Sequence, residues 1–283
     1  YKEPVERTFG DIDLLFPDEE VQPAMRILEQ LGYVAPADEV ASTYAALHFH
    51  YVMDKPNGFK VEVHWALERP DSSYRLDTAA FVANTTTIVS KVLGSFRTPR
   101  PEYAVLHLSV QNLENGFAKL SRLVDIDRLA RTEGFDWSLL QTLAQDAHAR
   151  VVVHTSLRLC AELLDTPVPP AALRSIAASS TARWHVATLE PARVVLEQRA
   201  HTRAAVSLLI DLWCRDSTRS RLQAVGELLR GRDLALGQTG EIGSRPAAAF
   251  KNAVRVAKLA AYQLFLYGRR PFIHPHTLPE YPS

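Results

Sequence analysis

The sequence predicts an α+β protein in which a small mixed-sheet head precedes an all-α-helical body. Alternating apolar and polar runs of strand length are confined to the first hundred residues. After them, apolar residues recur at helical spacing in one segment after another. A polar stretch with two prolines at residues 97–101 lies between the two patterns. We therefore expect a head domain over residues 1–98 and a helical domain over residues 99–283.

Composition limits the classes of protein to which the chain can belong. Its 283 residues, 47% of them hydrophobic, can bury a sizeable core and exclude intrinsic disorder. The 32 basic residues balance the 32 acidic ones, so we expect no binding of long nucleic acid through bulk charge. No transmembrane-length apolar run and no signal peptide is visible, so we expect a cytoplasmic protein that does not enter a membrane. Cys160 and Cys214 lie in apolar segments, which predicts reduced core thiols.

The first predicted elements are a strand and a helix. Residues 9–16 (FGDIDLLF) form an apolar-rich run before a proline, which predicts a strand. We expect Asp18 to be the N-cap of the next helix, because Glu19 and Glu20 then occupy the first turn, where the helix dipole favours acids. Apolar residues follow at helical spacing until Gly32, which predicts the end of the helix.

Two alternating runs predict a β-hairpin, and the rest of the chain predicts helices. The runs cover residues 47–53 (LHFHYVM) and 59–65 (FKVEVHW), with a Pro- and Asn-Gly-containing loop between them. A long amphipathic pattern over residues 103–131 is broken near Asn115. Residues 269–283 carry four prolines and predict an extended tail. The further predicted helices cover residues 136–150, 151–164, 170–178, 185–198, 201–214, 217–230 and 246–266.

A pair of acids lies in the first predicted strand. Asp11 and Asp13 are two residues apart, so their carboxylates share one face, while Ile12 and Leu14 point to the other face and the core. Two neighbouring carboxylates repel each other unless a cation lies between them, and Mg²⁺ is a suitable cation. The alternative is an exposed strand end with two solvated acids.

A third acid lies in the second strand of the predicted hairpin. Lys60, Glu62 and His64 share one face of that strand. Three carboxylates on strands are the ligand set of a two-metal phosphoryl-transfer site. Lys60 could instead form a cross-strand ion pair, and His64 could be a structural residue. His48 and His50 share a face of the neighbouring strand; with His64 they predict either a transition-metal site or a polar groove without metal.

Four segments of the chain resemble a known family. They are residues 7–15 (RTFGDIDLL), 61–65 (VEVHW), 105–108 (VLHL) and 119–125 (KLSRLVD). The first two resemble the R-x-x-G-D-h-D-L-L and E-h-H-W motifs of a largely uncharacterised nucleotidyltransferase family in the polymerase-beta-like superfamily. The last two segments are similar to its helical half. The resemblance covers about residues 1–165.

The resemblance implies a reaction and a set of site residues. An acceptor hydroxyl would attack the α-phosphate of a nucleoside triphosphate and displace pyrophosphate. The balanced charge of the chain predicts that this hydroxyl belongs to a small molecule or a protein. Asp11 and Asp13 would be ligands shared by two Mg²⁺ ions, with Mn²⁺ as an alternative, and Glu62 would be the third carboxylate. The residues expected to bind the nucleotide are Arg7, Gly10, Lys60, His64, Lys119 and Asp125. For Asp125, an interdomain salt bridge or a helix cap is the alternative.

Three rival functions remain open. Members of the superfamily have an earlier strand-turn-helix element that cradles the triphosphate, and this chain begins after it. We expect either an N-terminal truncation or a natural loss, and a loss would favour a non-catalytic binding module. A toxin-like enzyme that modifies tRNA or protein is a second rival. A third is a glycosyltransferase that holds a sugar nucleotide through Asp-x-Asp.

Overall fold

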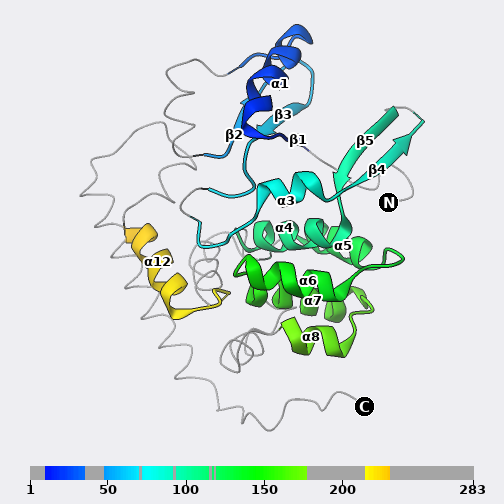
Figure 1. Cartoon of the computed structure of the whole chain (residues 1–283), viewed down its shortest axis with the longest axis vertical. Coiled ribbons are helices and arrows are strands. Elements are labelled where there is room, and N and C mark those ends of the chain that lie inside the picture. The colour runs from blue at the N-terminus through cyan, green and yellow to red at the C-terminus, as the bar shows by residue number, and fades with distance from the viewer. Residues whose placement is uncertain are drawn as a thin grey trace. The chain divides into compact units, whose positions relative to one another are not determined.

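The protein mixes helices and small sheets, with helices dominating, as Figure 1 shows for the computed structural model. This confirms the predicted α+β class. Two compact units are distinguished: residues 1–107 with 132–147, and residues 108–131 with 148–283. The division into domains 1–98 and 99–283 stays a prediction. The structure describes residues 10–35, 48–69, 72–91, 94–114, 117, 119–176 and 214–229.

The first unit contains a three-stranded mixed sheet in the order β1-β3-β2. Strand β1 (Asp11–Leu15) pairs in parallel with β3 (Lys60–His64), and β3 pairs antiparallel with β2 (His50–Met53). The predicted β-hairpin is therefore confirmed. Asn57, in its loop, adopts the left-handed conformation with a φ of 59°, which asparagine tolerates better than most residues.

Helix α1 (Asp18–Gln30) covers one face of this sheet (Figure 1). Asp18 is not the N-cap: Pro17 occupies that position, and Asp18 lies in the first turn with the two glutamates. Gly32, with a φ of 87°, follows the C-cap and ends the helix as predicted. Leu14 packs against the core between helix and sheet, whereas Ile12 stays 40% exposed. The buried members of this core are Val21, Met25, Leu28, Met53, Val61 and Val63.

Three elements of the first unit were not predicted. Helix α3 (Thr78–Ala83) is followed by β4 (Thr85–Ser90) and β5 (Gly94–Pro99), which pair as a two-stranded antiparallel ribbon. Much of the Pro-bearing stretch at residues 97–101 is thus regular structure. Its first proline ends a ribbon strand and its second begins a helix, and both positions tolerate a residue without a backbone N–H.

The remaining described elements are helices, as predicted. They are α4 (Pro101–Glu114), α5 (Leu120–Ala130), α6 (Trp137–Asp146), α7 (Arg150–Leu164), α8 (Pro170–Ile176) and α12 (Thr218–Leu229). The break near Asn115 separates α4 from α5. The helices predicted over 185–198 and 246–266, nearly all of that over 201–214, and the tail lie outside the described residues. Among the described helices, none has the length and apolarity to cross a membrane.

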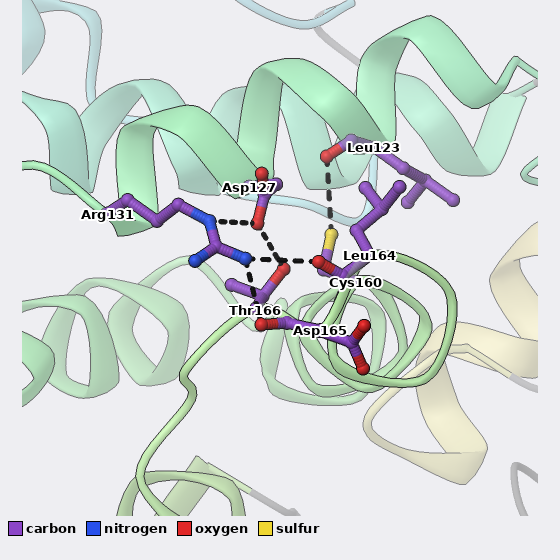
Figure 2. Close-up of polar contacts among 7 residues, drawn as sticks. All are labelled: Leu123, Asp127, Arg131, Cys160, Leu164, Asp165 and Thr166. Atoms are coloured by element: carbon purple, nitrogen blue, oxygen red, sulfur yellow. Dashed lines mark hydrogen bonds and ion pairs between the residues drawn. The ribbon is translucent and has the colours of Figure 1, made fainter.

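In the second unit, α7 packs against α5 and α8, and its C-terminal end is held by polar contacts shown in Figure 2. Arg131 donates hydrogen bonds to the carbonyl oxygens of Leu164, at 3.0 Å, and Asp165, at 2.8 Å. Asp127 accepts from Arg131 at 2.7 Å and from the Thr166 hydroxyl at 2.6 Å. These contacts satisfy carbonyl groups that a helix end leaves without a helical partner. We call Asp127, Arg131 and Thr166 the helix-end cluster.

The two cysteines of the second unit agree with the predicted core thiols. Cys160 and Cys214 are buried, and neither forms a disulfide. The Cys160 thiol donates to the carbonyl oxygen of Leu123 at 3.4 Å, as Figure 2 shows. Burial raises the pKa of this thiol to about 12, so it stays protonated and unreactive at neutral pH.

Candidate functional site

The register of the sheet brings together acids that lie far apart in the sequence. In the parallel pair, Asp11 is opposite Lys60, Asp13 is opposite Glu62, and Leu15 is opposite His64. Because opposite residues on neighbouring strands project to the same face, the carboxylates of both strands share one face of the sheet. The core with α1 lies on the other face.

The imidazole of His64 lies between Asp13 and Glu62. Its Nε2 atom is 3.3 Å from Oδ1 of Asp13 and 3.4 Å from Oε2 of Glu62. The side chain of His64 is 11% exposed and that of Glu62 22%, whereas that of Asp13 is 60% exposed. The cluster is therefore anchored in the sheet and open to solvent on the side of Asp13.

These contacts change the protonation of all three groups. Burial lowers the pKa of His64, but hydrogen bonds and charge from Asp13 and Glu62 outweigh it and raise that pKa to about 9. The hydrogen bond from His64 lowers the pKa of Asp13 against the opposing effect of burial. The hydrogen bond between His64 and Glu62 likewise lowers the pKa of Glu62, again against burial. An imidazolium between two carboxylates is thus the stable state of the cluster at neutral pH.

His50 adds a second imidazole from β2. It is opposite His64 in the antiparallel pair, and the two ring centroids are 4.8 Å apart. Its Nε2 atom is 3.7 Å from Oε2 of Glu62. Burial lowers the pKa of His50, which keeps the ring neutral at pH 7. We call Asp13, His50, Glu62 and His64 the sheet cluster.

The structure also locates the other residues predicted for the first unit. Asp11 is exposed at the first position of β1. Lys60 Nζ is 3.7 Å from Asp54 Oδ1, and both side chains are mostly exposed, so Lys60 forms the ion pair that was its alternative role. Gly10 is exposed, and within the described structure a Cβ atom there would meet nothing within 4 Å. Arg7 lies outside the described residues.

Two predicted residues belong to the second unit. Lys119 is exposed at the N-cap position of α5 and makes no side-chain capping hydrogen bond there. Asp125 is half-buried within the same helix. Their contact with a nucleotide stays a prediction.

Sequence reasoning did not include His50 among the site residues. The alternating pattern identifies His48 and His50 only as two of three histidines on one sheet edge, with metal binding or a polar groove as their role. The signal that could have singled out His50 is its position opposite His64, which depends on the register of the hairpin. The ring centroids of His48 and His50 are 5.8 Å apart, but His48 is not part of the group whose donor atoms converge.

The donor set can be tested against the Mg²⁺ that the motifs imply. Carboxylate oxygens are the ligands that Mg²⁺ prefers, and it is usually held by one or two of them. Asp13 and Glu62 already stabilise one positive charge between them, that of His64. Asp11 is exposed on the same face of β1. Asp11, Asp13 and Glu62 therefore fit a divalent cation, which would replace the positive charge of the His64 imidazolium between Asp13 and Glu62.

Comparison with known proteins points to the same part of the chain. A family model described as an uncharacterised nucleotidyltransferase matches residues 1–165. This span is more than half of the chain and includes the whole sheet cluster. No curated protein and no solved structure matches the chain.

Proposed function

This chain belongs to the uncharacterised nucleotidyltransferase family, and on that premise we propose that it transfers a nucleoside monophosphate to a hydroxyl group. The donor is a nucleoside triphosphate, and the acceptor is a small molecule or a protein side chain. The observation that carries the proposal is the register, in which Asp13 is opposite Glu62 on the face of the sheet away from the core with α1. Carboxylates that converge in this way are what phosphoryl transfer requires for a divalent cation.

The proposed reaction is an in-line displacement at phosphorus. The acceptor oxygen forms a bond to the α-phosphorus while the bond from that phosphorus to the pyrophosphate oxygen breaks. The hydroxyl proton passes to water or to a carboxylate of the site. The products are the nucleotidylated acceptor and pyrophosphate, so no oxidant or reductant is needed.

The residues of the chain have distinct roles in this proposal. Asp11, Asp13 and Glu62 hold Mg²⁺, or Mn²⁺ in its place. The bound ions supply charge that stabilises the phosphoryl group and the leaving pyrophosphate. Lys60 and His64 lie on the same strand face as Glu62. To contact a phosphate, Lys60 must leave its ion pair with Asp54, and His64 must leave Asp13 and Glu62. Within the described part of the chain, a Cβ atom at Gly10 would meet nothing within 4 Å, so a ligand can approach the backbone before β1 there.

The proposed class of acceptor rests on the net charge of the chain rather than on the sequence motifs. A net charge of zero provides no strong attraction for a polyanion such as long nucleic acid. We therefore propose a small-molecule or protein hydroxyl as the acceptor. A basic surface that binds tRNA would instead favour the toxin-like alternative.

The test is nucleotide transfer by the full chain. The purified protein is incubated with each α-labelled triphosphate, Mg²⁺ or Mn²⁺, and fractionated metabolites or proteins, and both labelled product and pyrophosphate are measured. Asp13→Asn and Glu62→Gln should each reduce transfer at least about 100-fold, because charge stabilisation at the transition state is lost. Glu29→Gln is the matched control, an exposed acid on the helix that covers the opposite face of the sheet. Transfer by Asp13→Asn at the unmodified rate would refute the proposal.

A further inference from the structure

We propose that the sheet cluster binds a divalent transition-metal ion through Nε2 of His50, Nε2 of His64 and the carboxylate of Glu62. Asp13 is the expected fourth ligand. The inference rests on the proposed function for the role of the ion, since both use Asp13 and Glu62. It differs in the ion and in its ligands, because it gives the two histidines a direct part in metal binding.

The distances within the cluster agree with a metal site. Nitrogen and oxygen donors of His50, Glu62 and His64 all lie within 4.8 Å of one another. Oε2 of Glu62 is 3.7 Å from Nε2 of His50 and 3.4 Å from Nε2 of His64. A tetrahedral ion with bonds of about 2.0–2.1 Å has ligands separated by roughly 3.4 Å. Small side-chain movements, together with release of the Nε2 proton of His64 to solvent, therefore bring these donors to one ion.

Asp13 contacts His64 but lies outside the group of donors that converge within 4.8 Å, so its side chain must move to become the fourth ligand. Its Oδ1 is 3.3 Å from Nε2 of His64, which also corresponds to one edge of a tetrahedron around a metal. It comes from a different strand than the other ligands, since His50 lies on β2 while Glu62 and His64 lie on β3. The three converging donors come from two paired strands, and Asp13 adds a third strand; rigid elements hold a metal geometry better than loops do.

The chemistry of the donors determines the class of ion. Imidazole nitrogen suits zinc, iron, nickel and copper, whereas Mg²⁺ prefers oxygen ligands and keeps several waters. Two histidines with one carboxylate form a common ligand set for transition metals. A site with both His50 and His64 at its centre therefore favours a transition metal over Mg²⁺. The carboxylate of Asp13 adds negative charge that a divalent ion neutralises.

The experiment measures metal binding directly, without relying on transfer activity. The full chain is stripped of metal with a chelator and titrated with Co²⁺, whose visible absorption is strong in four-coordinate sites with nitrogen ligands. We expect one Co²⁺ per chain, displacement by Zn²⁺, and no displacement by Mg²⁺ at equal concentration. Weak absorption typical of six oxygen ligands, or displacement by Mg²⁺, would contradict the inference.

Variants assign the ligands. His50→Asn and His64→Asn should each weaken Co²⁺ binding at least about 10-fold, because loss of a ligand costs no less than loss of a residue that orients one. His48→Asn is the matched control, a histidine two residues from His50 that is outside the converging group. Circular dichroism checks that each variant folds, and if His64→Asn does not, His50→Asn alone decides. Unchanged affinity in His50→Asn would overturn the assignment, as would an equal loss in His48→Asn.

The two proposals can fail separately. If Co²⁺ binds through His50 and His64 but no triphosphate is consumed with any metal, the metal site stands and the proposed function fails. If transfer proceeds with Mg²⁺ alone and His50→Asn retains the full rate and shows unchanged metal binding, the proposed function stands and the transition-metal site is wrong.

Discussion

The sheet cluster of the first unit and the helix-end cluster of the second unit both hold a carboxylate beside a cationic side chain, but they use it differently. Asp127 is 15% exposed and accepts hydrogen bonds from Arg131 and Thr166 (Figure 2). Asp13 is 60% exposed and contacts His64 alone among the contacts described for its side chain. The first carboxylate is enclosed by the fold, and the second remains open to solvent.

The difference teaches how a structural acid can be distinguished from a candidate ligand. A carboxylate has about four lone-pair positions. At the helix end, Asp127 accepts hydrogen bonds from Arg131 and Thr166, and Arg131 in turn donates to the carbonyl groups at the end of α7. Asp127 is therefore part of the structure that terminates the helix. In the sheet cluster, Asp13 and Glu62 share one imidazole, and the exposed Asp13 keeps acceptor capacity for a ligand. Charge alone would not separate the two cases, whereas exposure and hydrogen-bond partners do.

The largest expected effect on stability is at the helix end. Asp127→Asn should lower the free energy of unfolding by about 2 kcal/mol, because Arg131 and Thr166 lose a charged partner in a half-buried setting. Urea-induced unfolding, monitored by circular dichroism, measures the change. Glu162→Gln is the control, since it removes an ion pair of the same i,i+4 spacing with Arg158 on α7, and should cost no more than about 0.5 kcal/mol. Equal losses of unfolding free energy in Asp127→Asn and Glu162→Gln would contradict the structural role assigned to Asp127.

A smaller effect on stability is expected when the pH of the metal-free protein is raised, because His64 of the sheet cluster loses its proton. The pKa of His64 is about 9 when folded against 6.5 as its ordinary value, so its contribution to stability is fully present below pH 6.5 and is lost between pH 6.5 and 9. Asp13 and Glu62 are ionised throughout this window, and His50, whose pKa is lowered, is neutral. Because Asp13 is largely exposed to water, we expect a decrease of about 1 kcal/mol.

The measurement for this second prediction is urea-induced unfolding at several pH values in the presence of a chelator. In His64→Gln, the free energy of unfolding should decrease much less between pH 6.5 and 9, because no other member of the sheet cluster titrates there. A decrease that persists unchanged in His64→Gln would assign it to groups elsewhere in the chain.

The smallest expected effect on stability is at Gly10. Within the described structure, an added Cβ meets no atom within 4 Å, and Gly10 is not among the residues with positive φ. Gly10→Ala should therefore change the free energy of unfolding by no more than about 0.5 kcal/mol, with a slight gain from the stiffer unfolded chain. Triphosphate binding, measured by calorimetry, should weaken if a ligand approaches this backbone. Normal binding would show that Gly10 is not needed at the site.

Much of the fold could be predicted because its signals are local. The period-two pattern located β2 and β3, an apolar-rich run before Pro17 located β1, and helical periodicity located α1 and α4 to α8 within a few residues. The ribbon of β4 and β5 was missed because most of its residues are exposed on both faces, so no apolar alternation marks it. Helix α3 is only six residues long, too short for a helical period to be visible.

The candidate site was predictable in part. Strand periodicity alone placed Asp11 with Asp13, and Lys60 and Glu62 with His64. The helix-end role of Asp127 was not predictable, because its partner Thr166 meets it only when α5 packs against α7. The N-cap at Asp18 was wrong because Pro17, with its fixed φ, occupies the position before the first turn.

The sequence by itself therefore determined which acids and histidines share a face within each strand, since that depends only on the two-residue repeat of an extended chain. Only the tertiary structure decided that β1 pairs in parallel with β3 in the register that sets Asp13 opposite Glu62, and that His64 lies between them. The physical reason is that strand register is a non-local property. Here, burial of the opposite face of the sheet beneath α1 selects it, and a shift of one residue would turn the acids into the core.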